Sequence, residues 1–147
     1  MLDKNNKEKN YKVGDKVDLS KTTFKSGSIT IGNAEIGESF EYNYQYEIGG
    51  KVYDSKYTIS SSQGVILKLD ISSSYPFGLD NYMFLDTYGT LKYKIDDKEF
   101  IAKSFINKTP GSYVDGIYVS VDKNIMSATE IWFDIQIRSE KYIYKIK

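Results

Sequence analysis

The sequence predicts an all-β protein, an antiparallel β-sandwich of about ten strands. Three observations lead to this prediction. Apolar and polar residues alternate along many short segments, as they do in strands that bury one face. Turn residues separate these segments at spacings near the roughly 8–12 residues that are typical of sandwiches and barrels. No long segment carries a helical pattern of apolar side chains. A closed β-barrel is the alternative architecture.

The C-terminal segment predicts the clearest buried face. Its apolar side chains, Ile131, Phe133, Ile135 and Ile137, alternate with Trp132, Asp134, Gln136 and Arg138. A short turn at Ser139-Glu140 then sets the pairing: Ile137 with Tyr142, Ile135 with Tyr144, Phe133 with Ile146 and, on the exposed face, Asp134 with Lys145. Because a strand alternates its faces, Trp132 is expected to point away from the core.

A second hairpin is predicted around Gly49-Gly50. This dipeptide suits a two-residue turn with positive φ values, which glycine adopts freely. The turn predicts these pairs: Tyr46 with Tyr53, Tyr44 with Ser55, Tyr42 with Tyr57 and Phe40 with Ile59. The resulting aromatic face is either part of the core or a binding surface. Alternation with polar residues favours the core.

Other segments are predicted from the same patterns. Val65, Leu67, Leu69 and Ile71 predict a central strand, and Gly32 predicts a bulge within the strand over residues 28–36. Further expected elements are strands over residues 11–17, 81–85, 91–95, 98–106 and 116–121. A turn is expected at Asp96-Asp97, loops over residues 72–78 and 107–111, and a helical turn over residues 124–128.

Composition narrows the chemistry available to the chain. It has 20 basic and 20 acidic residues, and this balance does not favour nucleic acid as a partner. It has no His and no Cys, so imidazole bases, thiol nucleophiles and disulfides are excluded. Carboxylates remain as acid–base groups, but they lie near turns, where Asp is common for structural reasons. The sequence therefore predicts no enzyme activity, no metal site and no cofactor.

One domain is predicted, over residues 11–147. Residues 1–10 are charged and rich in amides, which predicts a disordered tether. The polar run after Met1-Leu2 does not resemble a signal peptide, and no apolar stretch is long enough to span a membrane.

Three patches of sequence suggest a family. The patches are Tyr11–Val17 leading to the strand at 28–36, then Phe84–Gly89 followed by Tyr93, and finally Pro110-Gly111, Gly116–Val119 and Ile131–Phe133. Their order resembles the immunoglobulin-like domains of unknown function that are attached to secreted lipoproteins of Gram-positive bacteria. Relative to that pattern, the tyrosine hairpin looks like an insertion. The resemblance implies an extracytoplasmic, membrane-tethered accessory domain, and it supplies no catalytic residues.

The sequence thus predicts a non-enzymatic immunoglobulin-like module of a bacterial cell-surface protein. Its role would be binding or spacing, its partner a protein or a cell-wall glycan, and its location outside the cytoplasm, anchored to the membrane in the full-length precursor. The alternative is a carbohydrate-binding module that uses exposed Tyr and Phe on loops. The candidate ligand-binding residues are Tyr75, Phe77, Tyr82 and Trp132, three on one irregular stretch and one on the C-terminal hairpin.

Overall fold

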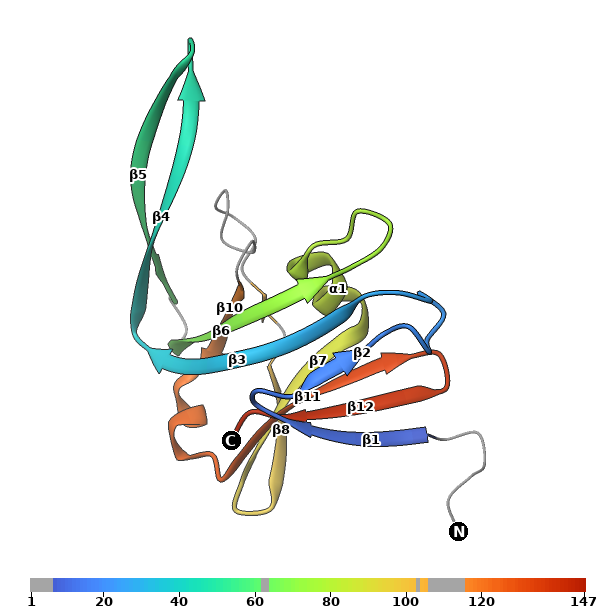
Figure 1. Cartoon of the computed structure of the whole chain (residues 1–147). Helices are drawn as coiled ribbons and strands as arrows, with labels where there is room; N and C mark the ends of the chain where they lie inside the picture. Colours follow the sequence, from blue (N-terminus) through green and yellow to red (C-terminus); the bar gives the residue numbers. More distant parts are fainter. Residues whose placement is uncertain (1–6, 62–63, 103, 106–115) are drawn as a thin grey trace.

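Two five-stranded sheets pack face to face in the computed structural model, and a two-stranded ribbon projects from them (Figure 1). The structure describes residues 7–61, 64–102, 104–105 and 116–147. The predicted β-sandwich is confirmed. The alternative of a closed barrel is wrong, because the described strands form separate open sheets. The predicted loop at residues 107–111 lies outside the described residues.

The first sheet contains both chain ends of the described structure. Its strands, in spatial order, are β1 (Lys7–Lys12), β12 (Glu140–Lys145), β11 (Glu130–Ile137), β7 (Gly89–Ile95) and β8 (Lys98–Ala102). Strand β1 runs parallel to β12, and the other neighbours are antiparallel. The β7–β8 turn uses Asp96 and Asp97, both with positive φ, as the sequence predicts.

The second sheet is antiparallel throughout. Its strands, in spatial order, are β2 (Lys16–Asp18), β3 (Ser28–Gly37), β6 (Gly64–Ser74), β10 (Gly116–Asp122) and β9 (Ser104–Phe105). The central position of β6 is confirmed. The bulge predicted at Gly32 is also confirmed, since the β3–β6 register shifts between Ile31 and Asn33.

The core lies between these two sheets. Ile131, Phe133, Ile135 and Ile137 of β11 are all buried, as their alternation predicts. Tyr144 of β12 joins the two sheets directly. Its hydroxyl accepts a hydrogen bond of 3.0 Å from the Ile31 backbone N–H and donates one of 2.7 Å to the Asp15 carbonyl oxygen.

The predicted register of the C-terminal hairpin is wrong by two residues. The turn is Arg138-Ser139, so Ile137 pairs with Glu140, Ile135 with Tyr142 and Phe133 with Tyr144. Arg138 adopts φ +54, a conformation that is uncommon for a residue other than glycine. A shift of two residues keeps every side chain on its predicted face, which is why the buried set is nevertheless correct.

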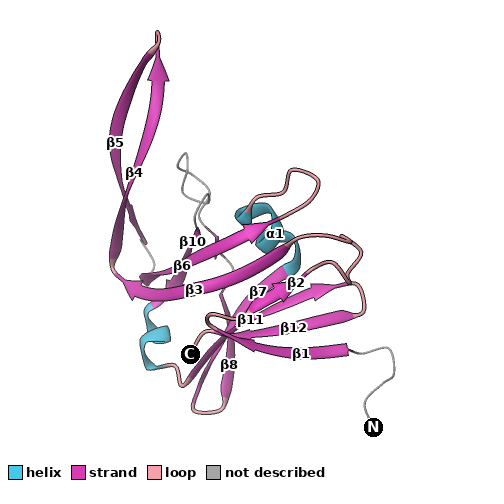
Figure 2. Ribbon diagram, in the orientation of Figure 1, coloured by secondary structure: helices cyan, strands magenta, loops and turns pink. Residues whose placement is uncertain are grey.

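The strand predicted over residues 81–85 is wrong. This segment is the helix α1 (Asn81–Tyr88), which leads straight into β7 (Figure 2). Asp80 caps it, because its carboxylate accepts a hydrogen bond of 2.8 Å from the Met83 backbone N–H. Phe84 and Leu85 are buried in the core. The predicted helical turn before β11 is confirmed as a short 3₁₀ helix, η1 (Lys123–Ser127).

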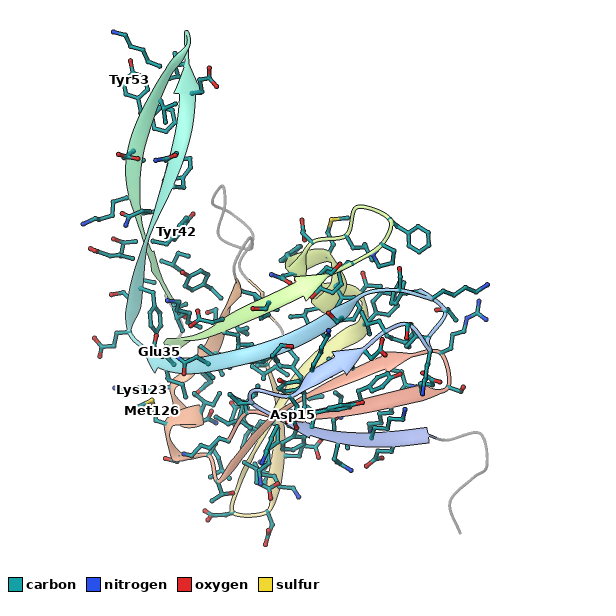
Figure 3. The ribbon with its side chains drawn as sticks, viewed as in Figure 1. Asp15, Glu35, Tyr42, Tyr53, Lys123 and Met126 are labelled. Atoms are coloured by element: carbon teal, nitrogen blue, oxygen red, sulfur yellow. The ribbon has the colours of Figure 1, made fainter. Side chains whose placement is uncertain are left out.

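Strands β4 (Ser39–Ile48) and β5 (Lys51–Ser60) form the projecting ribbon, with the predicted register at every predicted pair. The sequence favours a core position for the aromatic face of this ribbon, and this prediction is wrong for most of that face. Only its base joins a small buried cluster, in which Phe40 and Tyr42 pack against Ile59, Ile66 and Tyr118. Figure 3 shows Tyr42 closer to the sandwich and Tyr53 near the free end.

The predicted disordered tether is wrong for residues 7–10, which belong to β1; residues 1–6 lie outside the described residues. Tyr11 explains why this polar segment attaches to the sheet. Its ring stacks at 6.2 Å on that of Tyr144 and lies 6.0 Å from that of Tyr142. Across the described ranges, no helix is long and apolar enough to cross a membrane.

Candidate functional site

The outer face of the first sheet carries a hollow of about 550 Å³ around Trp132. Strands β1, β12, β11, β7 and β8 all contribute to its lining. Besides Trp132, Ile131, Ile143, Tyr11 and Asn10, the lining consists of the charged residues Lys12, Lys92, Lys94, Lys141, Lys145, Glu8, Glu99, Glu130 and Asp134. Five lysines against four carboxylates give the hollow one net positive charge.

Strand pairing places Trp132 in a row of lysines. Lys145 of β12 lies beside Trp132 on one side, and Lys92 of β7 lies beside it on the other. Lys12 of β1 pairs with Lys145 and extends the row by one strand. Neighbouring strands are about 4.8 Å apart, so these four side chains form one continuous strip across the sheet.

A buried carboxylate holds the indole in place. The Trp132 Nε1–H donates a hydrogen bond of 3.0 Å to Oδ1 of Asp134, which is only 8% exposed. The other oxygen of Asp134 lies 2.7 Å from the Lys92 ammonium and 3.9 Å from that of Lys141. Lys92 also pairs with Glu99 at 3.4 Å. The hydrogen bond to Asp134 raises the pKa of Lys92, which keeps this lysine charged.

Asp134 therefore does not have the partner that the sequence predicts. The expected pair with Lys145 depends on the wrong hairpin register, and Asp134 in fact lies opposite Ile143. It is also buried rather than exposed. The alternation along β7, β11 and β12 identifies the residues that point outward. Combined with the correct register, this pattern would have placed Lys92, Lys141 and Asp134 beside Trp132.

The four candidate residues of the sequence do not form one site. Trp132 lies in the hollow, whereas Tyr75, Phe77 and Tyr82 lie in and after the loop that joins β6 to α1. Phe77 is 81% exposed, with a positive φ of 62, and Tyr82 is half-buried on α1.

Tyr75 belongs to the edge of the core rather than to a contact surface. Its ring stacks on that of Phe84 at 4.7 Å, and its hydroxyl donates a hydrogen bond of 2.9 Å to Oδ1 of Asn81. Burial raises the pKa of this hydroxyl. The loop therefore presents Phe77 and keeps Tyr75 inside.

The ribbon offers a second exposed surface. Tyr46 and Tyr53 pair across its strands with ring centroids 5.4 Å apart, and they are 37% and 41% exposed. The Tyr44 and Tyr57 hydroxyls share a hydrogen bond of 3.0 Å, which raises the pKa of Tyr44 to about 12. The tyrosine rings lie against one another along this face, so each covers part of its neighbour's flat surface.

The family patches fold differently from the pattern that suggested them. The strand predicted over residues 81–85 covers the start of the second patch, but Phe84–Tyr88 belongs to α1. Pro110-Gly111 lies outside the described residues. Tyr11–Val17 spans the end of β1 and most of β2.

The comparisons with known proteins support the fold and nothing beyond it. No family model matches the chain, and no curated protein matches it. Among solved structures, it is similar to an uncharacterized β-sandwich protein from Clostridium difficile 630, with a TM-score of 0.55 and 13% sequence identity. The similarity covers 100% of this chain and 99% of that one. It shows that the described part of the chain has a β-sandwich fold.

Proposed function

We propose that this chain is a non-enzymatic binding module of a bacterial cell-surface protein and that its ligand occupies the hollow around Trp132. The observation that carries the proposal is the fixed indole. Trp132 is held by Asp134, and Asp134 is held by Lys92, so the ring needs little ordering when a ligand arrives. A sheet face that orients one aromatic ring in this way suits a binding surface better than a pure spacer.

The chemistry of the hollow supports binding rather than catalysis. The chain has no His and no Cys, so carboxylates and lysines are the charged groups available for acid–base work. Asp134, the most buried carboxylate of the lining, is already engaged by an indole N–H and two ammonium groups. Such a carboxylate positions other side chains and does not reach a ligand's proton.

The proposed location is outside the cytoplasm, with attachment to the membrane in the full-length precursor. This part of the proposal rests on the resemblance of the sequence to domains of secreted lipoproteins, since the β-sandwich fold does not bear on location. Fractionation of cells that express the native protein, followed by detection with an antibody, tests this point. Recovery in the cytoplasmic fraction would contradict it.

Sedimentation with purified bacterial cell-wall fragments tests the binding function. The wild-type chain is expected to sediment with the fragments, and Trp132→Ala is expected to stay in solution. Phe77→Ala is the matched control and also tests the loop alternative, since it removes an exposed aromatic ring that does not line the hollow. Melting temperatures verify that each variant is folded. Equal sedimentation of the wild type and a folded Trp132→Ala variant would contradict the proposal.

The alternative of a carbohydrate-binding module that uses loop aromatics has weaker support. Of the three rings proposed on that stretch, only Phe77 is exposed, because Tyr75 packs against Phe84 and Tyr82 is half-buried on α1. The hollow around Trp132 provides a better surface for the same class of ligand.

A further inference from the structure

We infer that the hollow around Trp132 binds a saccharide that carries a carboxylate, with one sugar ring on the indole and the carboxylate beside Lys145 and Lys12. This inference rests on the proposed function and names the ligand class for the same site. Three features of the hollow support it: an aromatic ring that no other ring stacks on, a lining that mixes donors and acceptors, and three lysines for which the described residues show no ion pair, two of them in the same row as Trp132.

The indole of Trp132 has a flat surface that no other ring of the described residues covers. Other aromatic side chains of the sandwich pair with one another, for example Tyr93 with Phe100 and Phe24 with Tyr88. Trp132 makes no such pair in the described ranges, and no lysine there lies over its ring. Trp132 is half-buried and its N–H is satisfied by Asp134, so a ligand meets the part of the indole's apolar surface that stays accessible. A pyranose presents a face of C–H groups that matches such a surface.

The rim of the hollow suits a ligand that both donates and accepts hydrogen bonds. Lysines supply donors, Glu8 and Glu130 supply acceptors, and Asn10 supplies both. A sugar hydroxyl uses either kind of partner. An alkyl chain uses neither, so a lipid tail would leave these groups without partners in a closed complex.

The lysines of the hollow that lack an ion pair among the described residues favour an acidic saccharide over a neutral one. Lys92 and Lys141 are occupied by Asp134 and Glu99, whereas Lys12 and Lys145 make no ion pair within the part of the chain that the structure describes. Both lie in the same row as Trp132, one and two strands away. At about 4.8 Å between strands, they flank the position of a group attached to the stacked sugar ring. Two free ammonium groups there favour a carboxylate.

A nucleic acid fits less well, although aromatic stacking and lysines are also used for single strands. Its phosphates carry a charge at every residue. The hollow has only one net positive charge, and its lining includes Glu8 and Glu130, which repel a polyanion. A saccharide with isolated carboxylates matches this balance better.

Intrinsic fluorescence tests the inference directly, because Trp132 is the only tryptophan of the chain. The full chain is titrated with a hyaluronan tetrasaccharide, in which every second sugar carries a carboxylate, with the methyl ester of this tetrasaccharide as the neutral match, and with a thymidine tetranucleotide. We expect a saturable change of emission with the acid. We expect a dissociation constant about tenfold lower for the acid than for the ester at low salt, and a smaller ratio at high salt.

Variants of the two lysines test their role. Lys145→Gln is expected to lower the acid-to-ester ratio, and the double variant Lys12→Gln/Lys145→Gln is expected to bring it close to one, because both ammonium groups lie beside the carboxylate. Lys51→Gln, at the exposed tip of the ribbon, is the matched control and should keep the wild-type ratio. A reduced affinity for both ligands in Lys145→Gln would mean a general structural role and would contradict the assignment.

The outcomes separate this inference from the proposed function. Any one of three results overturns the inference that the ligand is a saccharide with a carboxylate. These results are equal affinity for acid and ester, tighter binding of the tetranucleotide, and no emission change with any probe. If sedimentation with wall fragments still requires Trp132 in those cases, the binding function stands with another ligand. If sedimentation is independent of Trp132, both proposals are overturned.

Discussion

The Trp132 indole N–H donates a 3.0 Å hydrogen bond to Oδ1 of Asp134, two residues further along the same strand and on the same face. Asp134 is buried on an outer sheet face because Lys92 and Lys141 neutralise it from the strands on either side. Three strands therefore cooperate to orient one aromatic ring. This arrangement is the basis of the binding function proposed for the hollow.

The first prediction concerns the charge on Asp134. Asp134→Asn keeps an oxygen for the indole N–H but loses the attraction to Lys92, so the free energy of unfolding should fall by about 1–3 kcal/mol. Glu41→Gln is the matched control. It removes the ion pair with Lys56, in which both side chains are exposed, and should lower the free energy of unfolding by less than about 1 kcal/mol. Urea titrations measure both values, and equal losses would contradict the role assigned to Asp134.

The second prediction concerns the buried face of β11. Phe133 is fully buried between the sheets, so Phe133→Ala should lower the free energy of unfolding by about 3–5 kcal/mol. Met126→Ala, in the exposed part of η1, should change it by less than about 0.5 kcal/mol. A urea titration that finds similar losses for the two variants would mean that the faces are reversed.

Much of the fold is predictable from local patterns, because those patterns act through near neighbours. Gly49-Gly50 determines the β4–β5 register, since both residues adopt positive φ in the turn. The β11–β12 register is not predictable in this way. Arg138 adopts a positive φ, which nothing in its residue type indicates. Strand β1 is missed because, Tyr11 apart, it is polar and attaches to a sheet edge.

Helix α1 is short, but it has a signal that the strand interpretation overlooked. Asn81, Phe84, Leu85 and Tyr88 recur at the spacing of one helical face, and the first three are buried. Asp80 precedes them at the capping position. Phe84 also packs against Tyr75 and Phe24, and these contacts hold the helix against the rest of the molecule. The sequence alone does not predict these contacts.

The third prediction separates the two aromatic residues of the loop before α1. Tyr75→Ser should lower the melting temperature by several degrees, because it removes the stacking on Phe84 and the hydrogen bond to Asn81. Phe77→Ser should leave the melting temperature nearly unchanged, because the ring is exposed. Thermal unfolding followed by circular dichroism measures both. A larger effect of Phe77→Ser would contradict the placement of these rings.

The fourth prediction concerns alkaline pH. Burial raises the pKa of Tyr142 and of Tyr144 above the usual value of about 10. Above pH 10 the unfolded chain therefore loses protons that the folded chain keeps, so the free energy of unfolding should fall as pH rises. Below pH 10 these two groups make no contribution to a pH dependence.

Tyr144→Phe provides the internal check. It should be less stable than the wild type at pH 7 by about 1–3 kcal/mol, because the Ile31 N–H loses its partner. It should also lose less stability than the wild type between pH 7 and about pH 11. Urea titrations at the two pH values give both quantities. Wild-type stability that stays constant up to about pH 11 would disprove the assigned cause.

The candidate site could be predicted only in part. Alternation on β11 predicts that Trp132 points outward, and this is confirmed by its place in the hollow. The lysines beside it come from β1, β7 and β12, which are far apart in the sequence. Their meeting depends on strand order and register. In particular, the parallel pairing of β1 with β12 brings Lys12 next to Lys145, and no local pattern indicates such a pair.

The most direct test of the binding surface is a ¹H–¹⁵N correlation spectrum recorded during titration with soluble cell-wall saccharide fragments. The single tryptophan contributes one indole N–H signal, and that proton is the one bonded to Asp134. The account predicts that this signal and the amides of β11, β12 and β7 around the hollow shift together. Shifts confined to the β4–β5 ribbon, with an unmoved indole signal, would contradict it.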